Sequence, residues 1–336
     1  MKTSFTSQAW STLISFAVFI AILLGTFSIQ LKNASAGLDR WVGHEDHRLP
    51  NIRLVPQTCR HAVLGRFIEL QPVDKGDVFI FGDSQFFARG ATQEEIFTTH
   101  WLGSEPTVIN FSFLGAPISA MENIIKELDR RDLKAPISLT NINLTHYIKP
   151  LDYVEPAETE NASFIQNIRR FIAKLDQRAI LPEKPGALSP VYANRFVCSF
   201  RMRKAFAEDS LRTPRYRKLL SEFSQVNLRK AYVNFDEIDF FETIQPRVKS
   251  FENISDRTIF ITAPMAYDKF HLYNFETNNL DKFSTAFKEL CSEHAKLECY
   301  DILRDINSEG FMDLIHMSAN GHAKLGQILK DIIPPE

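Results

Sequence analysis

This sequence of 336 residues has almost no net charge, few cysteines and no common cofactor-binding motif. The formal net charge of −2 gives no reason to expect a nucleic acid as a partner. The four cysteines lack the spacing of a zinc site, and neither a phosphate-binding loop nor a dinucleotide-binding fingerprint occurs. We therefore expect no metal and no cofactor. Internal repeats and low-complexity tracts do not occur either, which leaves one large globular domain or two small ones.

A long uncharged hydrophobic run, residues 13–29, lies near the N-terminus. As a helix it would rise about 26 Å, and the uncharged residues beside it extend it to the roughly 30 Å of a membrane's hydrocarbon core. We therefore predict a cytoplasmic N-terminus over residues 1–12 and a transmembrane anchor over residues 13–31. Two alternatives stay open: a signal peptide cleaved near the small residues 34–36, and a buried core helix. Anchor and signal alike place residues 37–336 outside the cytoplasm, either held on the periplasmic or cell-surface side of a membrane or secreted.

Four cysteines are consistent with an oxidising compartment, where disulfides form and persist. Cys291 and Cys299 are eight residues apart, at a probable helix end and a strand start, so they could form a bridge. Cys59 and Cys198 could form a second one. Four buried free thiols are the alternative.

Five short runs of β-branched or apolar residues alternate with helix-like stretches in the rest of the chain. Strands separated by helices favour a parallel sheet that is covered on both faces. We therefore expect an α/β fold with a parallel sheet over residues 76–336, joined to the N-terminal segment by a tether over residues 32–75. The predicted strands are residues 77–82, 107–112, 136–142, 257–264 and 296–302.

Helical patterns occur between these strands and in one long interruption. Residues 119–133 form one such pattern, with Ser119 and Glu122 as a capping box at its start, and residues 278–295 form another. The interruption, residues 146–256, is too long for a simple crossover, so we interpret it as a helical insertion that forms a cap or lid. In parallel sheets the loops at the carboxyl ends of the strands hold the ligand, and the insertion leaves from one of these loops. Its predicted helices are residues 161–177 and 215–232.

Two short motifs carry the residue types of acyl-transfer chemistry. Ser84 follows the first predicted strand and precedes a helix-compatible segment, whose N–H groups and dipole would favour a developing negative charge. Asp313 and His316 are three residues apart in a loop near the C-terminus, a spacing that lets the carboxylate bind Nδ1 while Nε2 points outward as a base. A helix starts after them, near Ser318 or Asn320. Because the two motifs follow the first and last strands at the same sheet edge, we expect their side chains to converge.

In these two motifs the chain resembles the SGNH (GDSL-type) hydrolase superfamily. The marks of that superfamily are a Gly-Asp-Ser block near the start of the domain and an Asp-x-x-His block near its end. Here they stand as Gly82-Asp83-Ser84 and Asp313-Leu314-Ile315-His316. The resemblance covers roughly residues 76–145 and 257–330. It implies a three-layer α/β/α sandwich with Ser84 as nucleophile, His316 as base and Asp313 as the residue that orients the base.

Two further blocks of that superfamily supply oxyanion donors, and they match less closely. The glycine of the second block is Gly115, whose N–H would join that of Ser84. The third block usually reads Gly-x-Asn-Asp. Here its asparagine aligns with Asn143, and Asn141 and Leu144 stand in place of the glycine and the aspartate. Asn141 is the alternative donor, and the remaining interpretation takes Asn143 as a simple turn residue.

Other residues near the two motifs, and elsewhere in the chain, are expected to have structural or surface roles. Asp83 would hold the turn by accepting hydrogen bonds from backbone N–H groups. His146, His271 and His322 are expected at the surface or in a substrate pocket rather than on a metal. The basic stretch at residues 201–218 is predicted to be a solvated helical face, with binding of an anionic polysaccharide as the alternative.

Gln85 departs from the leucine that often follows Gly-Asp-Ser in secreted lipases. Together with the hydrophobic N-terminal run, this makes the chain look closer to anchored envelope members of the superfamily, which include alginate O-acetyltransferase relatives and the D-alanyl transfer protein of teichoic-acid operons. The resemblance therefore implies a serine-dependent acyl-ester hydrolase or O-acetyltransferase acting on cell-envelope or exported polysaccharide, with a membrane-bound O-acyltransferase as a candidate partner. The alternative is a catalytically inactive, membrane-tethered binding or assembly protein with the same fold.

Overall fold

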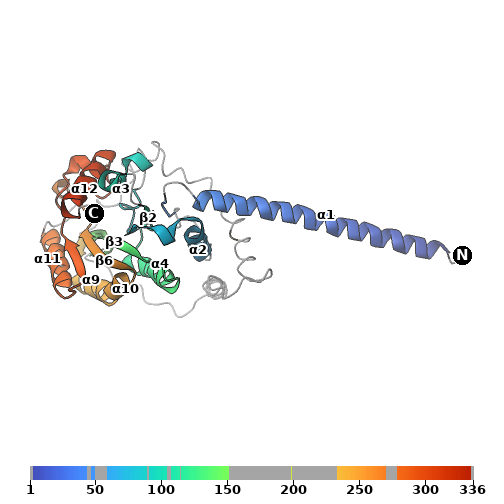
Figure 1. Cartoon of the computed structure of the whole chain (residues 1–336), viewed down its shortest axis with the longest axis horizontal. Coiled ribbons are helices and arrows are strands. Elements are labelled where there is room, and N and C mark those ends of the chain that lie inside the picture. The colour runs from blue at the N-terminus through green and yellow to red at the C-terminus, as the bar shows by residue number, and fades with distance from the viewer. Residues whose placement is uncertain are drawn as a thin grey trace.

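Five strands, all parallel, form the sheet around which the chain is folded (Figure 1). The computed structural model describes residues 3–43, 47–49, 59–88, 91–103, 107–113, 115–150, 198, 233–269 and 278–333. Counted along the chain, the strand order 2-1-3-4-5 is that of a doubly wound sheet, so the predicted α/β class and all five predicted strands are confirmed. In spatial order the strands are β2 (Val108–Asn110), β1 (Val78–Phe81), β3 (Ala135–Ile142), β6 (Ser255–Thr262) and β7 (Leu297–Tyr300).

Helices cover both faces of the sheet. Successive side chains of a strand point to opposite faces, and in this sheet both faces carry apolar side chains that the helices bury. In β1, Phe79 and Phe81 belong to one hydrophobic cluster, whereas Val78 and Ile80 belong to another. The first cluster contains residues of α2 (Arg60–Leu70), α4 (Ile118–Arg130), α9 (Glu237–Ile244), α10 (Val248–Glu252) and α11 (Asn278–Ser292). The second contains residues of α3 (Phe97–Leu102) and α12 (Ala319–Ile332).

Aromatic side chains fill much of the first cluster. The ring of Phe111 lies edge-on to Phe79 and stacks on Phe81, with centroid distances of 5.4 Å in both cases. Phe81 also meets Phe251 of α10 edge-on at 5.9 Å, and Phe251 meets Phe260 of β6 at 5.2 Å. These contacts hold the centre of the sheet, and with it the carboxyl ends of β1 and β3, against the helical layer.

Two predicted helices are present, but one predicted cap is wrong. The segments at 119–133 and 278–295 form α4 and α11. The N-cap of α4 is Pro117, which makes no side-chain capping bond, so Ser119 already lies inside the helix and cannot cap it. Thr92 and Glu95 form a capping box instead, at the start of the short 3-10 helix η3 (Gln93–Glu95).

The segment predicted as a tether contains more regular structure than expected. The helix α1 (Thr3–Val42) packs Leu38 and Val42 into the core, and Arg66 of α2 binds both carboxylate oxygens of Asp39 at 2.7 and 3.0 Å. Residues 47–49 lie beside the edge strand β2, where Leu49 N donates to the carbonyl oxygen of Asn110 at 2.7 Å. Residues of the predicted tether, from Leu38 in α1 to residues 47–49, therefore pack as part of the domain.

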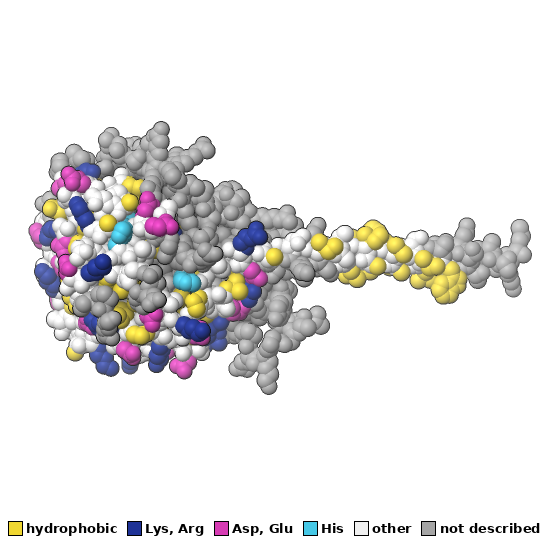
Figure 2. All heavy atoms as spheres, turned by 45° about the horizontal axis from the view of Figure 1, so that its top comes forward, with side chains coloured by type: hydrophobic (Ala, Val, Ile, Leu, Met, Phe, Trp, Pro, Cys, Tyr) yellow, Lys and Arg dark blue, Asp and Glu magenta, His cyan; other side chains and the backbone are white. Residues whose placement is uncertain are grey.

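The remainder of α1 projects away from the domain (Figure 1). The predicted transmembrane segment, residues 13–31, lies in this projecting part. Of the large hydrophobic side chains exposed in the described residues, eleven of thirteen belong to α1. Figure 2 shows them as apolar surface along the helix. In the part of the chain that the structure describes, no helix is both long and apolar enough to cross a membrane.

Two segments within the predicted insertion, residues 148–150 and 233–235, lie side by side. β4 (Ile148–Pro150) pairs antiparallel with β5 (Val233–Phe235) in a separate two-stranded sheet. Residues 237–252, placed by the sequence within the insertion, form α9 and α10, whose buried residues join α4 in the first cluster and so belong to the sandwich. The predicted helices at 161–177 and 215–232 and the basic stretch at 201–218 lie outside the described residues.

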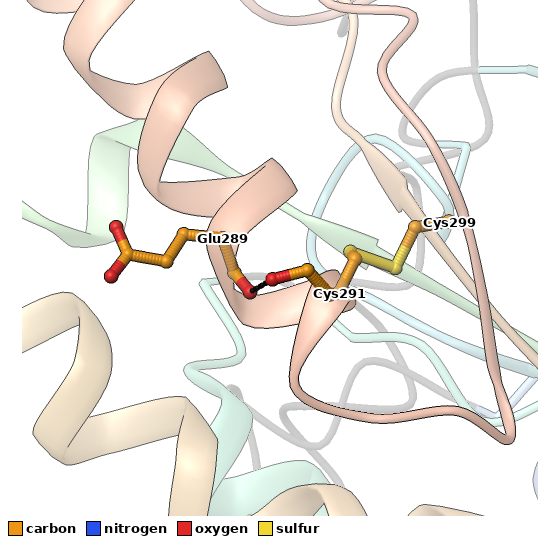
Figure 3. Close-up of a disulfide and its surroundings, with 4 residues drawn as sticks. Glu289, Cys291 and Cys299 are labelled. Atoms are coloured by element: carbon orange, nitrogen blue, oxygen red, sulfur yellow. Dashed lines mark hydrogen bonds between the residues drawn. A yellow bond between two sulfur atoms is a disulfide. The ribbon is translucent and has the colours of Figure 1, made fainter.

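Both predicted cysteine pairs are disulfides, so the alternative of free thiols is wrong. Cys59 is bonded to Cys198, which connects the start of α2 to the inserted segment. Cys291 is bonded to Cys299, which ties the C-terminal end of α11 to β7 (Figure 3). Beside it, the hydroxyl of Ser292 donates to the carbonyl oxygen of Glu289 in the last turn of the helix at 2.7 Å. Disulfides of this kind are typical of chains that fold outside the reducing cytosol.

Candidate active site

The first motif lies immediately after β1, where the chain turns at the carboxyl edge of the sheet. Gly82 permits a close approach here, since an added Cβ would stand 2.4 Å from Oδ1 of Asn141 and 2.6 Å from Cβ of Phe86. Asp83 Oδ1 accepts the N–H of Gln85 at 2.9 Å. The expectation that Asp83 holds the turn is therefore confirmed. Ser84, at the centre of this turn, is 8% exposed.

No regular helix starts at Ser84, so the predicted contribution of a helix dipole is wrong. Phe87 N donates to the carbonyl oxygen of Asp83 at 2.9 Å, which gives a single helical turn. Ala88 then adopts φ +54°, a left-handed conformation that ends it. The next α-helix, α3, begins only at Phe97. Negative charge developing at Ser84 is therefore not stabilised by the dipole of a helix that begins there. Individual N–H groups near Ser84 are the remaining donors.

The second motif forms a compact loop before α12. Asp313 Oδ1 accepts the backbone N–H groups of Ile315 at 2.9 Å and His316 at 2.7 Å, while its Oδ2 lies 2.7 Å from Nδ1 of His316. Burial alone would raise the pKa of Asp313, but its hydrogen bonds and the nearby imidazole together lower that pKa. The loop ends at Ser318, whose side chain caps α12 by accepting the N–H of Gly321, so the helix begins where the sequence predicts.

The structure brings the two motifs into contact. Nε2 of His316 lies 3.0 Å from Oγ of Ser84. Because the lowered pKa keeps Asp313 ionised and thus an acceptor only, Nδ1 of His316 carries the hydrogen of their bond. In the neutral imidazole Nε2 is then an acceptor, and the hydroxyl of Ser84 is its donor. This is the tautomer that a general base needs.

Gln85 joins the two motifs, a role that the sequence does not reveal. Its side chain is 1% exposed. Nε2 of Gln85 donates to the carbonyl oxygen of Pro264, just after β6, at 2.8 Å and also to that of Ile315, next to His316. The leucine that often follows Gly-Asp-Ser has no donor for these carbonyls. The departure from that leucine therefore has a structural reason.

The two asparagines proposed as oxyanion donors both contact Asp83. Asn141 is engaged at both ends, since its Oδ1 accepts Asp83 N at 3.2 Å and its Nδ2 donates to Asp83 Oδ1 at 3.0 Å. Asn143 donates one Nδ2 hydrogen to Asp83 Oδ2, and its Oδ1 accepts the N–H of Thr145 at 3.0 Å. Nδ2 of an amide carries two hydrogens, so one hydrogen of Asn143 is left to bind an oxyanion.

Gly115 lies in the turn that follows β2. Ala116 N donates to the carbonyl oxygen of Phe113 at 3.2 Å, which closes a turn with Gly115 at φ +62°. That conformation favours glycine, as in turns whose third residue has a positive φ. Phe113 N in turn donates to the carbonyl oxygen of Gly82 at 3.1 Å. The loop of Gly115 is therefore attached to the loop of Ser84.

Three other histidines were considered in the sequence, and of the two that the structure describes, His146 belongs to the site and His322 does not. Its Nε2 lies 3.3 Å from Oδ2 of Asp83, and its side chain is half-buried. His322 is buried in α12 and stacks on Phe97 at 6.2 Å, so it is not a surface residue. His271 lies outside the described residues. Over the described ranges, no group of three or more His, Cys, Asp or Glu side chains is arranged to hold a metal ion.

No model of a known protein family and no curated protein sequence matches this chain. The function must therefore be inferred from the residues themselves. The site combines a hydroxyl, an imidazole in the accepting tautomer and a carboxylate, all at the carboxyl edge of a parallel sheet where such sheets bind ligands. Chemically, this set can abstract the proton of Ser84 and return it to a leaving group.

Proposed function

We propose that this protein is a serine-dependent acyl-ester hydrolase or O-acyltransferase. The observation that carries the proposal is the 3.0 Å contact between Ser84 Oγ and His316 Nε2, with Asp313 bound to the other ring nitrogen at 2.7 Å. All three side chains are at least nine-tenths buried, which strengthens their electrostatic coupling. The likeness of the two motifs to SGNH hydrolases agrees with this chemistry.

In the proposed reaction the Ser84 hydroxyl attacks the carbonyl carbon of an ester while His316 Nε2 takes its proton. Asp313 stabilises the imidazolium that forms. The tetrahedral oxyanion is held by backbone N–H groups of Ser84 and Gly115 and by the remaining amide hydrogen of Asn143. Collapse of this intermediate breaks the ester bond, and the alcohol leaves with the proton from His316. The acyl group stays on Ser84.

Release of the acyl group decides between hydrolysis and transfer. His316 removes a proton from water or from a sugar hydroxyl, whose oxygen attacks the acyl-serine. Water yields a carboxylic acid, and a sugar hydroxyl yields a new ester. We propose an acylated envelope or exported polysaccharide as the substrate class and a membrane-bound O-acyltransferase as a partner, on the strength of the likeness to anchored SGNH members.

We also propose that α1 attaches the domain to a membrane from outside the cytoplasm. Support comes from the exposed apolar side chains of α1, among them Trp10, Phe16 and Leu24, and from the two disulfides. Apolar surface of this extent in water favours insertion into lipid or into another protein. Flotation of the full chain with liposomes tests the attachment, which is wrong if the protein stays at the bottom of the gradient.

Hydrolysis of p-nitrophenyl acetate by the full chain in detergent micelles is the test of the proposed enzyme. Ser84→Ala should lower the rate by about 10⁴–10⁶-fold, as removal of a catalytic serine does elsewhere. Ser292→Ala, which removes a hydroxyl at the end of α11, is the matched control and should leave the rate unchanged. Mass spectrometry of an added oligosaccharide separates transfer from hydrolysis.

The competing function is a membrane-attached binding or assembly protein of the same fold. It predicts no hydrolysis and no labelling of Ser84 by a fluorophosphonate. The observation that favours it is that both asparagine amides give one Nδ2 hydrogen to Asp83, which leaves each of them a single hydrogen for an oxyanion. Labelling that disappears in Ser84→Ala would exclude this function.

A further inference from the structure

The site contains a second carboxylate–imidazole pair that the proposed reaction does not use. Asp83 Oδ2 lies 3.3 Å from Nε2 of His146, and the Asp83 side chain is almost completely buried. Its carboxylate accepts four hydrogen bonds, from Gln85 N, Asn141 Nδ2, Asn143 Nδ2 and His146 Nε2. A carboxylate next to the nucleophile with every lone-pair direction occupied is poorly placed to act as a base. Its contacts point instead to a role in positioning.

The surroundings of Asp83 determine which of the two groups carries the proton of their hydrogen bond. Burial by itself would raise the pKa of Asp83, but the hydrogen bonds and charge of His146, together with those from Asn141 and Gln85 N, lower that pKa. Asp83 is therefore ionised and only accepts hydrogen bonds, so His146 Nε2 is the donor. His146 thus stabilises the negative charge that holds the asparagine amides.

The amide of Asn143 has its orientation set from both ends. Its Oδ1 accepts from the N–H of Thr145 at 3.0 Å and from the hydroxyl of Thr145 at 2.9 Å. Its Nδ2 donates to Asp83 Oδ2, the oxygen that also receives the hydrogen bond of His146. Rotation of the amide by 180° would place its oxygen against a carboxylate, so only one orientation is stable.

The strand register brings the segments that carry this amide and the nucleophile to the same edge of the sheet. Phe81 of β1 pairs with Thr140 of β3. Three residues beyond this last pair stand Ser84 on one chain segment and Asn143 on the other. The contact of Asp83 with both asparagines holds the two segments together past the end of the sheet. A donor fixed here can meet the oxygen of an acyl group carried by Ser84.

We propose that His146 is a positioning residue that acts through Asp83 to aim the second Nδ2 hydrogen of Asn143 at the oxyanion. This inference rests on the proposed function, because an oxyanion forms only if Ser84 is a nucleophile. It assigns to His146 no contact with the reacting atoms. It does give a reason for a half-buried histidine three residues after Asn143, on the 3-10 helix η4 (Leu144–His146).

Two substitutions of His146 separate positioning from simple packing. His146→Leu keeps a side chain of similar size but removes the donor, whereas His146→Gln restores an N–H near the place of Nε2. We expect His146→Leu to lower kcat for p-nitrophenyl acetate by about 10–10²-fold, less than the 10²–10³-fold typical when an oxyanion donor is removed outright. KM should change less than twofold. His146→Gln should recover kcat to within about fivefold of the natural protein.

A double-substitution cycle shows whether the effect passes through Asn143. If it does, His146→Leu combined with Asn143→Ala is no slower than Asn143→Ala alone, because the positioned donor is already gone. If the fold-losses in kcat of the two single substitutions multiply in the double variant, the two residues act independently and the proposal is wrong. An unchanged kcat in His146→Leu would overturn it too. Failure of His146→Gln to recover activity would overturn it as well.

A second readout does not depend on turnover. In full-chain protein labelled with [¹⁵N]asparagine, the side-chain NH₂ signals of Asn143 are assigned by their absence from Asn143→Ala. His146→Leu should shift or broaden these signals, and His146→Gln should leave them near their original positions. Unchanged Asn143 signals in His146→Leu overturn the positioning role. Altered signals in a protein that neither hydrolyses esters nor labels at Ser84 overturn the proposed function instead.

Discussion

Nε2 of His316 lies 3.0 Å from Oγ of Ser84, although 232 residues separate the two in the chain. The contact depends on the tautomer of the imidazole, which Asp313 sets from the other side at 2.7 Å. In the proposed reaction, Ser84 and His316 therefore act only in the presence of Asp313. The geometry allows the role of Asp313 to be tested without moving the loop.

Asp313→Asn should retain the loop and lose the activity. The Oδ1 of asparagine can still accept the N–H groups of Ile315 and His316. Its Nδ2 would donate to Nδ1 of His316, which forces the ring hydrogen onto Nε2 and removes the acceptor for Ser84. We expect kcat for p-nitrophenyl acetate to fall by about 10⁴-fold. Asp281→Asn, at a surface ion pair with Arg304, is the control. A fall of less than tenfold would contradict the assignment.

Gln85→Leu should weaken the connection between the two motifs. The substitution leaves the carbonyl oxygens of Pro264 and Ile315 without their donor, and a buried polar group without a partner costs about 1–3 kcal/mol. We therefore expect the free energy of unfolding in urea to fall by about that amount and kcat to fall with it, since the loop of His316 loses a support. Gln245→Leu removes an exposed glutamine that binds Glu293 and should change stability by less than about 0.5 kcal/mol. Equal effects of the two substitutions would refute the role of Gln85.

The strands and the convergence of Ser84, Asp313 and His316 could be predicted from the sequence because their signals are local. Each strand is a short apolar run, and the serine motif stands directly after the first of these runs, while the Asp-x-x-His motif follows the last one after an intervening loop. The turn after Ser84 could not be predicted, because distant groups bind its carbonyls. Asn110 Nδ2 donates to Phe86 O at 2.7 Å, and the guanidinium of Arg48 donates to Phe87 O at 3.4 Å. These bonds compete with the helix that the local sequence favours.

The same distinction explains the helix missed in the tether. In α2 the apolar residues do recur at helical spacing, but Gly65 interrupts them and lowers the helix propensity of the isolated segment. Tertiary packing stabilises this helix instead, since Val63 and Phe67 are fully buried and the ring of Phe67 lies edge-on to that of Phe111 at 5.7 Å. The contacts of Gln85 and His146 could likewise not be predicted, because their partners belong to other segments of the chain.

Acid should destabilise the protein through Asp83 and Asp313. Both carboxyls have a folded-state pKa below the ordinary value of 3.8, so the unfolded chain binds protons more readily than the folded one. The stabilisation is complete above about pH 4 to 5 and is lost as the pH falls below 3.8 toward the folded-state pKa. Urea unfolding at several pH values between 2 and 5 gives the free energy of unfolding as a function of pH. The slope of that free energy against pH should be smaller in Asp313→Asn than in the natural protein, by up to about 1.4 kcal/mol per pH unit. An unchanged slope would show that Asp313 does not contribute, and Asp281→Asn serves as the surface control.

The two disulfides should differ in their contributions to stability. Cys291 and Cys299 close a loop over a sequence separation of 8, whereas Cys59 and Cys198 close one over a separation of 139. In the chain-entropy account, the loss of the first costs about 2.5 kcal/mol and the loss of the second about 5 kcal/mol, because the longer loop restricts the unfolded chain more. Urea unfolding of the Cys291→Ser/Cys299→Ser and Cys59→Ser/Cys198→Ser proteins measures both. If the short loop proves the more costly to open, the attachment of α11 to β7 stabilises the folded sheet directly, and the entropic account is wrong for this protein.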